Sequence, residues 1–190
     1  MRYLSTTRDD ALFYAANTTL ELCGYTDADW AGSTYERRST SGYMFSLGSV
    51  AITWSSKKQS TVALSSIEAE YHGAAVAACE IAWLCKLLTD LCVDVTHKVV
   101  IYCDKLNSIQ LARNPVFHAR TKHIEVHYHF IWECVLAGDI DLVYIGTDEQ
   151  VANIFTKALG AEKLRRFWTM LGVQEMELSL RGSVEMSSST

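Results

Sequence analysis

The pattern of apolar and polar positions begins with short β-type runs. Residues 20–30 form one such run, and residues 41–49 and 50–56 form two more that are rich in aromatic and β-branched side chains. A turn signal at Gly48 and Ser49 separates the second run from the third. Runs of this kind predict a strand followed by a β-hairpin, so we expect three consecutive antiparallel strands.

A long helical pattern follows the hairpin. Ala, Glu, Leu and Trp dominate residues 65–91, and the word SSIE, from Ser65 to Glu68, has the S-x-x-E form of a capping box. This word places the start of the helix at Ser65. The next run, KVVIYCD at residues 98–104, is almost continuously apolar, as is typical of a strand covered on both faces.

The remaining pattern alternates between helices and strands. We expect helices at about 106–114, 121–136, 149–159 and 161–171, and a strand at 139–145. This order predicts an α/β fold: a five-stranded mixed sheet, with three antiparallel strands and then two further strands, and helices on both faces. We expect residues 20–173 to form this domain, residues 1–19 to precede it, and residues 174–190 to be a disordered tail.

Composition narrows the class of protein. The chain has 190 residues, of which 49% are hydrophobic, enough to build a core. No apolar run approaches the roughly 18–20 residues of a membrane span, and the N-terminus lacks the apolar stretch of a secretory signal. The six cysteines form no CxxC pair and mostly lie in apolar surroundings, which is typical of buried, reduced thiols, with disulfides or a zinc site as alternatives. We therefore expect an intracellular, cytoplasmic protein that is not secreted and not membrane-bound.

The charges are unevenly distributed. A net charge of -5 argues against broad nonspecific binding to nucleic acid. Basic residues nevertheless recur at Arg37, Arg38, Lys57, Lys58, Arg113, Arg120 and Lys122, whereas acids gather at Asp27, Asp29, Glu68 and Glu70. An acidic centre with basic flanks suits a site that holds divalent cations and receives a polyanion. The same distribution also fits an ordinary solvated surface.

Three acids lie where an open α/β sheet forms a cleft. Asp27 is in the first strand, Glu68 in the first turn of the long helix, and Asp104 at the carboxyl end of the buried strand. Carboxylates this close would repel one another, and divalent cations relieve that repulsion. Mg²⁺ suits such oxygen ligands, and two ions can activate water and stabilise the leaving oxygen of a phosphodiester. Glu68 also fits a helix cap and Asp104 a turn, so both interpretations stay open.

Longer words in the sequence resemble a known family. GYTDADWAG, RRSTSGYMF, WSSKKQSTVALSSIEAEY, IYCD, NPVFHARTKHIEVHYHFI and DEQVANIFTKAL together resemble the ribonuclease H domain of Ty1/copia-type retrotransposon Pol polyproteins. The resemblance covers about residues 20–173, and residues 1–14 resemble the end of the preceding reverse transcriptase region. It implies an RNase H fold that hydrolyses the RNA strand of an RNA–DNA hybrid with two Mg²⁺ ions, which Mn²⁺ can replace. It also implies a reverse transcriptase portion as partner, and cytoplasmic virus-like particles in the parent family.

The resemblance assigns the site position by position. It implies that Asp27, Glu68 and Asp104 are catalytic residues and metal ligands. The family's fourth carboxylate belongs to a Q-[VL]-A-D-I word, which here reads QVANI, so Asn153 takes its place. Asparagine offers a carbonyl oxygen without a charge, so one of the two metals should bind more weakly.

Two further functions compete with the ribonuclease. Asn153, together with Trp132 in HFIWE where the family word resembles HFIRE, motivates an inactive relic that only binds nucleic acid. A DNA strand-transfer enzyme on the same fold would carry its acids in the order D…D…E, whereas the order Asp27, Glu68, Asp104 favours the ribonuclease.

Basic side chains are the candidates for substrate contact. We expect Arg120, Lys122 and His123, with Lys57 and Lys58, to contact the phosphates of the nucleic acid. Zinc binding is the alternative for the histidine-rich word HIEVH, whose histidines have i, i+4 spacing. The glutamate of HIEVH is one place later than in H-E-x-x-H, so phosphate contact is the favoured interpretation.

Overall fold

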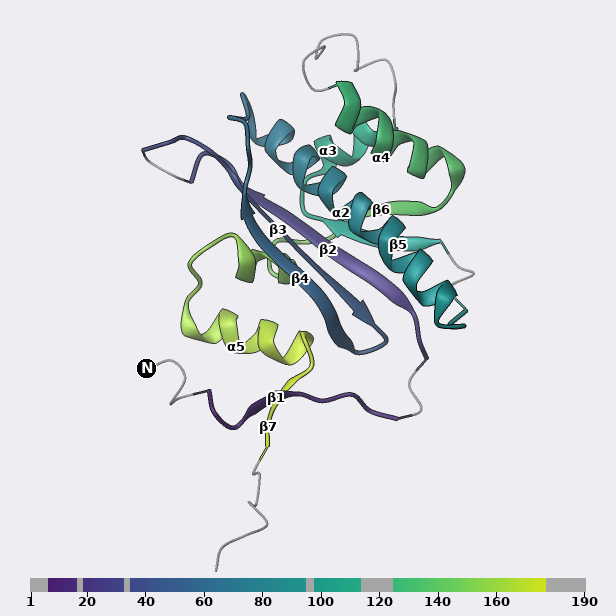
Figure 1. Ribbon diagram of the computed structural model, residues 1–190. Helices are drawn as coiled ribbons and strands as arrows, with labels where there is room; N and C mark the ends of the chain where they lie inside the picture. The colour runs from purple at the N-terminus through teal and green to yellow at the C-terminus, as the bar shows by residue number, and fades with distance from the viewer. Residues whose placement is uncertain (1–6, 17–18, 33–34, 95–97, 114–124, 177–190) are drawn as a thin grey trace, which may run out of the picture.

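A five-stranded mixed sheet forms the centre of the fold (Figure 1). The computed structural model describes residues 7–16, 19–32, 35–94, 98–113 and 125–176. The strands are β2 (Leu22–Asp29), β3 (Thr40–Leu47), β4 (Val50–Lys58), β5 (Val99–Cys103) and β6 (Ile140–Tyr144). Their order across the sheet is β4-β3-β2-β5-β6.

The pairing of the strands agrees with the predicted topology. Strand β3 pairs antiparallel with both β2 and β4, whereas β2 pairs parallel with β5, and β5 parallel with β6. The first three strands therefore form the antiparallel meander, and the last two join through helices. The predicted five-stranded mixed α/β sheet is confirmed.

One face of the sheet is covered by helix α2, Ser66–Asp90. The Ser65 hydroxyl caps this helix by accepting a hydrogen bond from the Glu68 amide at 3.2 Å, as the capping-box word predicts. A side chain at Gly73 would come within 3.3 Å of the Thr26 hydroxyl, so glycine permits α2 to approach β2 closely. Helices α3 (Leu106–Arg113) and α4 (Glu125–Ala137) pack against α2 and share its apolar core.

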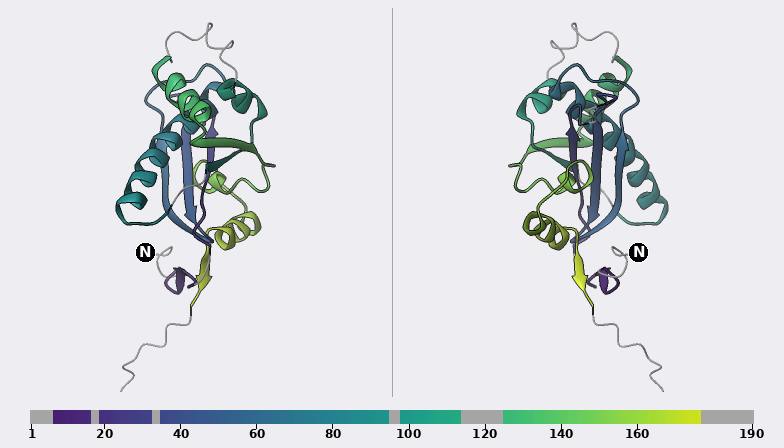
Figure 2. Two further views of the ribbon diagram at one scale, coloured as in Figure 1. Left: turned by 90° about the vertical axis from the view of Figure 1, so that its right-hand side faces the viewer. Right: turned by 90° about the vertical axis from the view of Figure 1, so that its left-hand side faces the viewer.

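The opposite face carries the 3₁₀ helix η3 (Val151–Phe155) and helix α5 (Ala161–Met170), as Figure 2 shows. Met44, Ala51, Val151, Phe167 and Leu171 form the core there. The prediction of a helix at 149–159 is wrong in type and length. Three consecutive η3 residues are buried, which leaves no solvent-facing side for an amphipathic α-helix.

A second, two-stranded sheet was not predicted. Strand β1 (Asp10–Leu12) pairs antiparallel with β7 (Val173–Glu175). The Tyr14 hydroxyl donates to the Ala51 carbonyl at 2.9 Å, which attaches this sheet to the start of β4. The domain limits at 19/20 and 173/174 stay predictions, and the predicted disordered tail lies, from residue 177 on, outside the described residues.

The cysteines and the helices bear on two further expectations. All six cysteines are free thiols, but only Cys103 is buried, while Cys79 and Cys92 are exposed. Within the part of the chain that the structure describes, every helix is too short or too polar to cross a membrane.

Candidate metal centre

Three buried carboxylates converge at the carboxyl ends of β2 and β5. Each of Asp27, Glu70 and Asp104 offers an oxygen, and these oxygens all lie within 4.8 Å of one another. Tyr25 pairs with Tyr102 across the parallel strands, so the two aspartates, each two residues further on, come to the same level of the sheet. The predicted approach of Asp27 and Asp104 is therefore what the register produces.

The third carboxylate of the cluster differs from the residue predicted as a ligand, and the ligand assignments themselves stay predictions. Asp27 and Asp104 are joined by Glu70, and Glu68 is not a member of this cluster. The Glu68 carboxylate instead accepts a hydrogen bond from the Leu64 amide at 2.8 Å, at the start of α2. Residues two positions apart on an α-helix point in directions that differ by about 200°. Only one of the two glutamates can therefore face the sheet. The alternative interpretation of Glu68, as part of a helix cap, matches its position.

A signal for Glu70 was present in the sequence. Gly73, Ala74 and Ala77 follow Glu70 at spacings of three, four and seven, and all are buried. This small-residue stripe marks the face of the helix that lies against the sheet. Glu70 belongs to that stripe, and its Oε2 accepts a hydrogen bond from the Ala28 amide of β2 at 3.1 Å.

The segment around η3 holds the two strands together behind the carboxylates. The side-chain amide of Gln150, which is fully buried, donates to the Thr26 carbonyl at 2.9 Å and to the Tyr102 carbonyl at 3.2 Å. These two carbonyls lie in β2 and β5, next to the site. A side chain at Gly42 of β3 would come within 2.8 Å of Phe155, so glycine permits η3 to lie directly on the sheet.

The residues after η3 contact Asp27. The Thr156 hydroxyl donates to Asp27 Oδ2, and the Lys157 ammonium donates to Asp27 Oδ1 at 2.9 Å. The same ammonium donates to Asn153 Oδ1 at 2.8 Å. The Asn153 amide nitrogen donates to the Thr147 carbonyl at 3.1 Å, which fixes the orientation of the side chain. The structure therefore places Asn153 beside Asp27, with Lys157 between them.

Asp104 presents an open acceptor. Its Oδ2 accepts a hydrogen bond from the Thr147 hydroxyl at 3.1 Å. Its Oδ1 is buried and has no hydrogen-bond partner among the described residues. A buried carboxylate oxygen without a partner is costly unless a cation or a proton satisfies it. The all-oxygen donor set and this open atom fit a hard divalent metal ion.

The pKa values of the groups in the cluster also fit a site that binds a cation. Burial, reinforced by the charges of Asp27 and Asp104, raises the pKa of Glu70 to about 9. Burial alone would lower the pKa of Lys157, but the charge and hydrogen bond of Asp27 outweigh it, so that pKa is raised. Without a metal, the site therefore favours a protonated Glu70 and a charged Lys157 near neutral pH.

The predicted substrate contacts are placed only in part. Lys57 and Lys58 are exposed at the end of β4, and Lys58 pairs with Glu36 at 3.0 Å. Arg120, Lys122 and His123 lie outside the described residues. All five assignments stay predictions.

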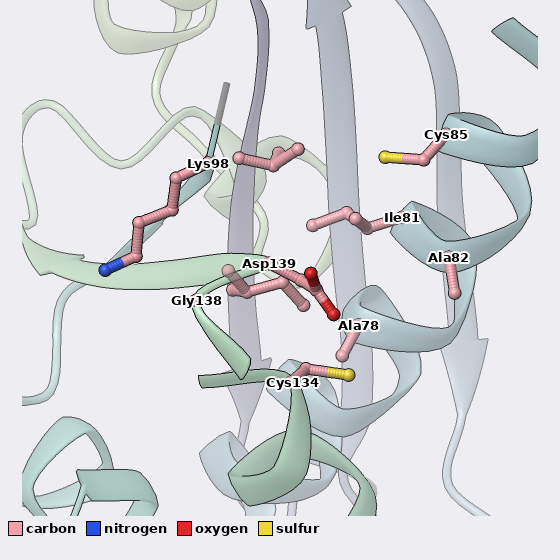
Figure 3. Close-up of a pocket in the computed structure, with 10 residues that line it drawn as sticks. Ala78, Ile81, Ala82, Cys85, Lys98, Cys134, Gly138 and Asp139 are labelled. Carbon is pink, nitrogen blue, oxygen red and sulfur yellow. The ribbon is translucent and has the colours of Figure 1, made fainter. Parts of the chain in front are cut away.

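A pocket of about 440 Å³ lies elsewhere in the molecule (Figure 3). It is lined by α2, by the end of α4 and the segment after it, and by Val99 and Ile140, which begin β5 and β6. Because β5 ends near Asp104, this pocket is at the opposite end of the parallel strands from the carboxylates. The thiols of Cys85 and Cys134 lie on its wall. Its position separates it from the metal centre.

The sequence comparison identifies relatives over nearly the whole chain. The retrovirus-related Pol polyproteins from transposons RE2 and RE1 of Arabidopsis thaliana are each 43% identical to it, over 96% and 91% of its length. The chain spans 12% of the length of either polyprotein. No family model matches it.

The structural comparison supports the fold. The foamy viral protease-reverse transcriptase, solved in complex with an RNA/DNA hybrid, matches with a TM-score of 0.52 and 12% identity, over 77% of this chain and 20% of that one. The N-terminal RNase H domain of rv2228c from Mycobacterium tuberculosis has a TM-score of 0.49 at 11% identity, over 79% of this chain and 97% of that one. The chain has the predicted RNase H-like fold.

Proposed function

Since the chain is related over nearly all of its length to part of the Pol polyproteins of plant transposons, we propose that it is a ribonuclease H-type endoribonuclease. Its substrate would be an RNA–DNA hybrid, of which it hydrolyses the RNA strand. The observation that carries this proposal is the convergence of Asp27, Glu70 and Asp104 at the carboxyl ends of two parallel strands. The foamy viral protease-reverse transcriptase, which shares the fold, was solved with such a hybrid.

The site residues divide the work of binding. Asp27, Glu70 and Asp104 would hold Mg²⁺, or Mn²⁺ in its place, and the resemblance implies two such ions. A bound ion of this kind supplies an activated water and a positive charge near the leaving 3′-oxygen. Thr156 and Thr147 orient the two aspartates by donating to them, and Gln150 fixes the spacing of their strands.

The surroundings of the site follow from the same relationship. The reverse transcriptase portion of a parent polyprotein would be its partner. Arg120, Lys122 and His123, with Lys57 and Lys58, would bind the phosphates of the hybrid. The reaction would take place in the cytoplasm, within virus-like particles.

A cleavage assay tests the proposal. With a hybrid whose RNA strand is end-labelled, the protein in Mg²⁺ or Mn²⁺ should produce shorter RNA fragments. Asp27→Asn should reduce the rate at least about 100-fold, because a buried ligand at the centre of the cluster loses its charge. Asp29→Asn is the matched control, since Asp29 is on the same strand but outside the cluster. Cleavage that persists in Asp27→Asn would contradict the proposed site.

Asn153 favours a second candidate, a relic that binds the hybrid without cleaving it. Hybrid binding by the wild-type protein without fragments would support the relic.

If the position supports catalysis, Asn153→Asp should raise the cleavage rate several-fold, because it returns a negative charge beside Asp27. The same change removes the donor to the Thr147 carbonyl, so the metal-free protein should lose about 1–2 kcal/mol of stability.

Rates and urea denaturation, measured together, check both expectations for Asn153→Asp. Asn153→Ala is the comparison variant, since it removes the amide without adding charge. An unchanged or lower rate for Asn153→Asp would refute the role of position 153 as a weakened fourth ligand.

A further inference from the structure

Lys157 gives the acidic site a cation of its own. The Lys157 ammonium lies within 2.9 Å of Asp27 Oδ1 and 2.8 Å of Asn153 Oδ1. We propose that this ammonium occupies one of the two cation positions of the site, so that this chain binds a single divalent ion between Asp27, Glu70 and Asp104. The inference rests on the proposed function only in treating the carboxylate cluster as a metal site.

The free acceptors of the site are asymmetric. Both oxygens of Asp27 already accept hydrogen bonds, Oδ1 from Lys157 and Oδ2 from Thr156. Asp104 has an open, buried Oδ1 instead. Carboxylate oxygens have further lone pairs, so Asp27 can still be a ligand for an ion that Asp104 and Glu70 help to hold. A single ion therefore has a place on the Asp104 side without displacing Lys157.

A second ion on the Asn153 side would have to displace the ammonium. Among the described residues, Asp27 is the only carboxylate that Lys157 contacts there, and its other partner is the neutral amide oxygen of Asn153. An ammonium needs little from its surroundings beyond one carboxylate and one carbonyl-type oxygen. A divalent ion in the same place would have one charged ligand, Asp27, since Asn153 offers only a neutral oxygen, and it would have to displace the ammonium.

The backbone holds Lys157 in this position. Its amide donates to the Asn153 carbonyl at 3.0 Å, directly after η3. Lysine and asparagine are therefore four residues apart on one turn, and that turn is fixed to the sheet by Gln150. The fold thus fixes the backbone of Lys157 one turn from Asn153, and the hydrogen bonds to Asp27 and Asn153 hold its ammonium.

Metal binding without substrate tests this inference. Mn²⁺ is titrated into the metal-free protein and counted by electron paramagnetic resonance of the free ion, for wild type, Lys157→Met and Lys163→Met. Lys163 is the matched control, because its ammonium also lies 2.9 Å from a carboxylate, that of Asp148, which is not part of the carboxylate cluster. We expect one ion in wild type and in Lys163→Met. Lys157→Met should bind Mn²⁺ at least about tenfold more tightly, since a positive charge no longer opposes the ion.

The contrary results are distinct. Two ions in wild type, or a dissociation constant for Lys157→Met within twofold of wild type, would overturn the inference and leave the proposed function intact. Failure of both wild type and Lys157→Met to bind Mn²⁺ would overturn the inference and also contradict a metal-dependent ribonuclease. If Lys157→Met does not fold without metal, circular dichroism should show that Mn²⁺ restores its folding, and no recovery would overturn the inference. Lys157→Arg, which keeps the charge, should retain one ion.

Discussion

Glu70→Gln should reduce cleavage of an RNA–DNA hybrid at least about 100-fold, whereas Glu68→Gln should leave the rate within about threefold of wild type. Glu70 is 4% exposed and brings an oxygen to the two aspartates. Glutamine keeps the shape but offers the metal a neutral oxygen. Glu68 lies at the cap of α2, where glutamine can still accept the hydrogen bond from the Leu64 amide.

Single-turnover rates at saturating Mg²⁺ separate these two glutamates. Thermal unfolding of both variants shows whether either change disturbs the fold. The opposite ranking, with Glu68→Gln inactive and Glu70→Gln active, would restore the ligand set that the sequence resemblance implies and reject the one built from the geometry.

The metal-free protein should lose stability as the pH rises from about 5 to 8. Burial and the neighbouring carboxylates raise the pKa of Glu70 from its ordinary value of 4.5 to about 9. Stability from the protonated form is fully present below the unfolded pKa and is lost as the pH rises through the folded pKa. At about 1.4 kcal/mol per pH unit, the loss from pH 5 to 8 is at most about 4 kcal/mol.

Urea denaturation in EDTA at several pH values measures this loss. Glu70→Gln cannot ionise, so its stability should change less over the same range. Mg²⁺ should also flatten the curve, because the ion takes over the role of the proton on Glu70. Lys157 does not contribute in this window, since its pKa is raised from 10.5. Parallel pH dependences for wild type and Glu70→Gln would contradict the electrostatic account of the cluster.

The elements that the sequence predicted well are those with a strong local pattern. The three antiparallel strands and the buried β5 follow from short apolar runs and a turn signal, and the cap of α2 follows from a capping word. Strands β1 and β7 have three residues each, too few to show a period. The segment of η3 was predicted to be a longer helix. Three consecutive residues of η3 are buried, and this burial results from tertiary packing.

The site was predictable from the sequence only in part. Asp27 and Asp104 follow from their positions near the ends of neighbouring strands, whereas the word EAE offers two glutamates. The two glutamates are distinguished by helix periodicity, which places Glu70 on the same face as the small residues Gly73 and Ala74. The resemblance assigned Glu68 without considering which face of the helix lies against the sheet. Lys157 could not be found from the sequence, because its partner Asp27 is 130 residues away and no local pattern links the two.

The contacts of Gln150 also have a consequence for the order of folding. This side chain is 124 residues away in sequence from the Thr26 carbonyl that it contacts. Contacts that close so long a loop form late, after local helices and hairpins have reduced the entropy cost of closure. We therefore expect the final spacing of the two aspartates to be set only when the apolar core already exists. Their mutual repulsion would then oppose the last step of folding and leave the earlier steps unaffected.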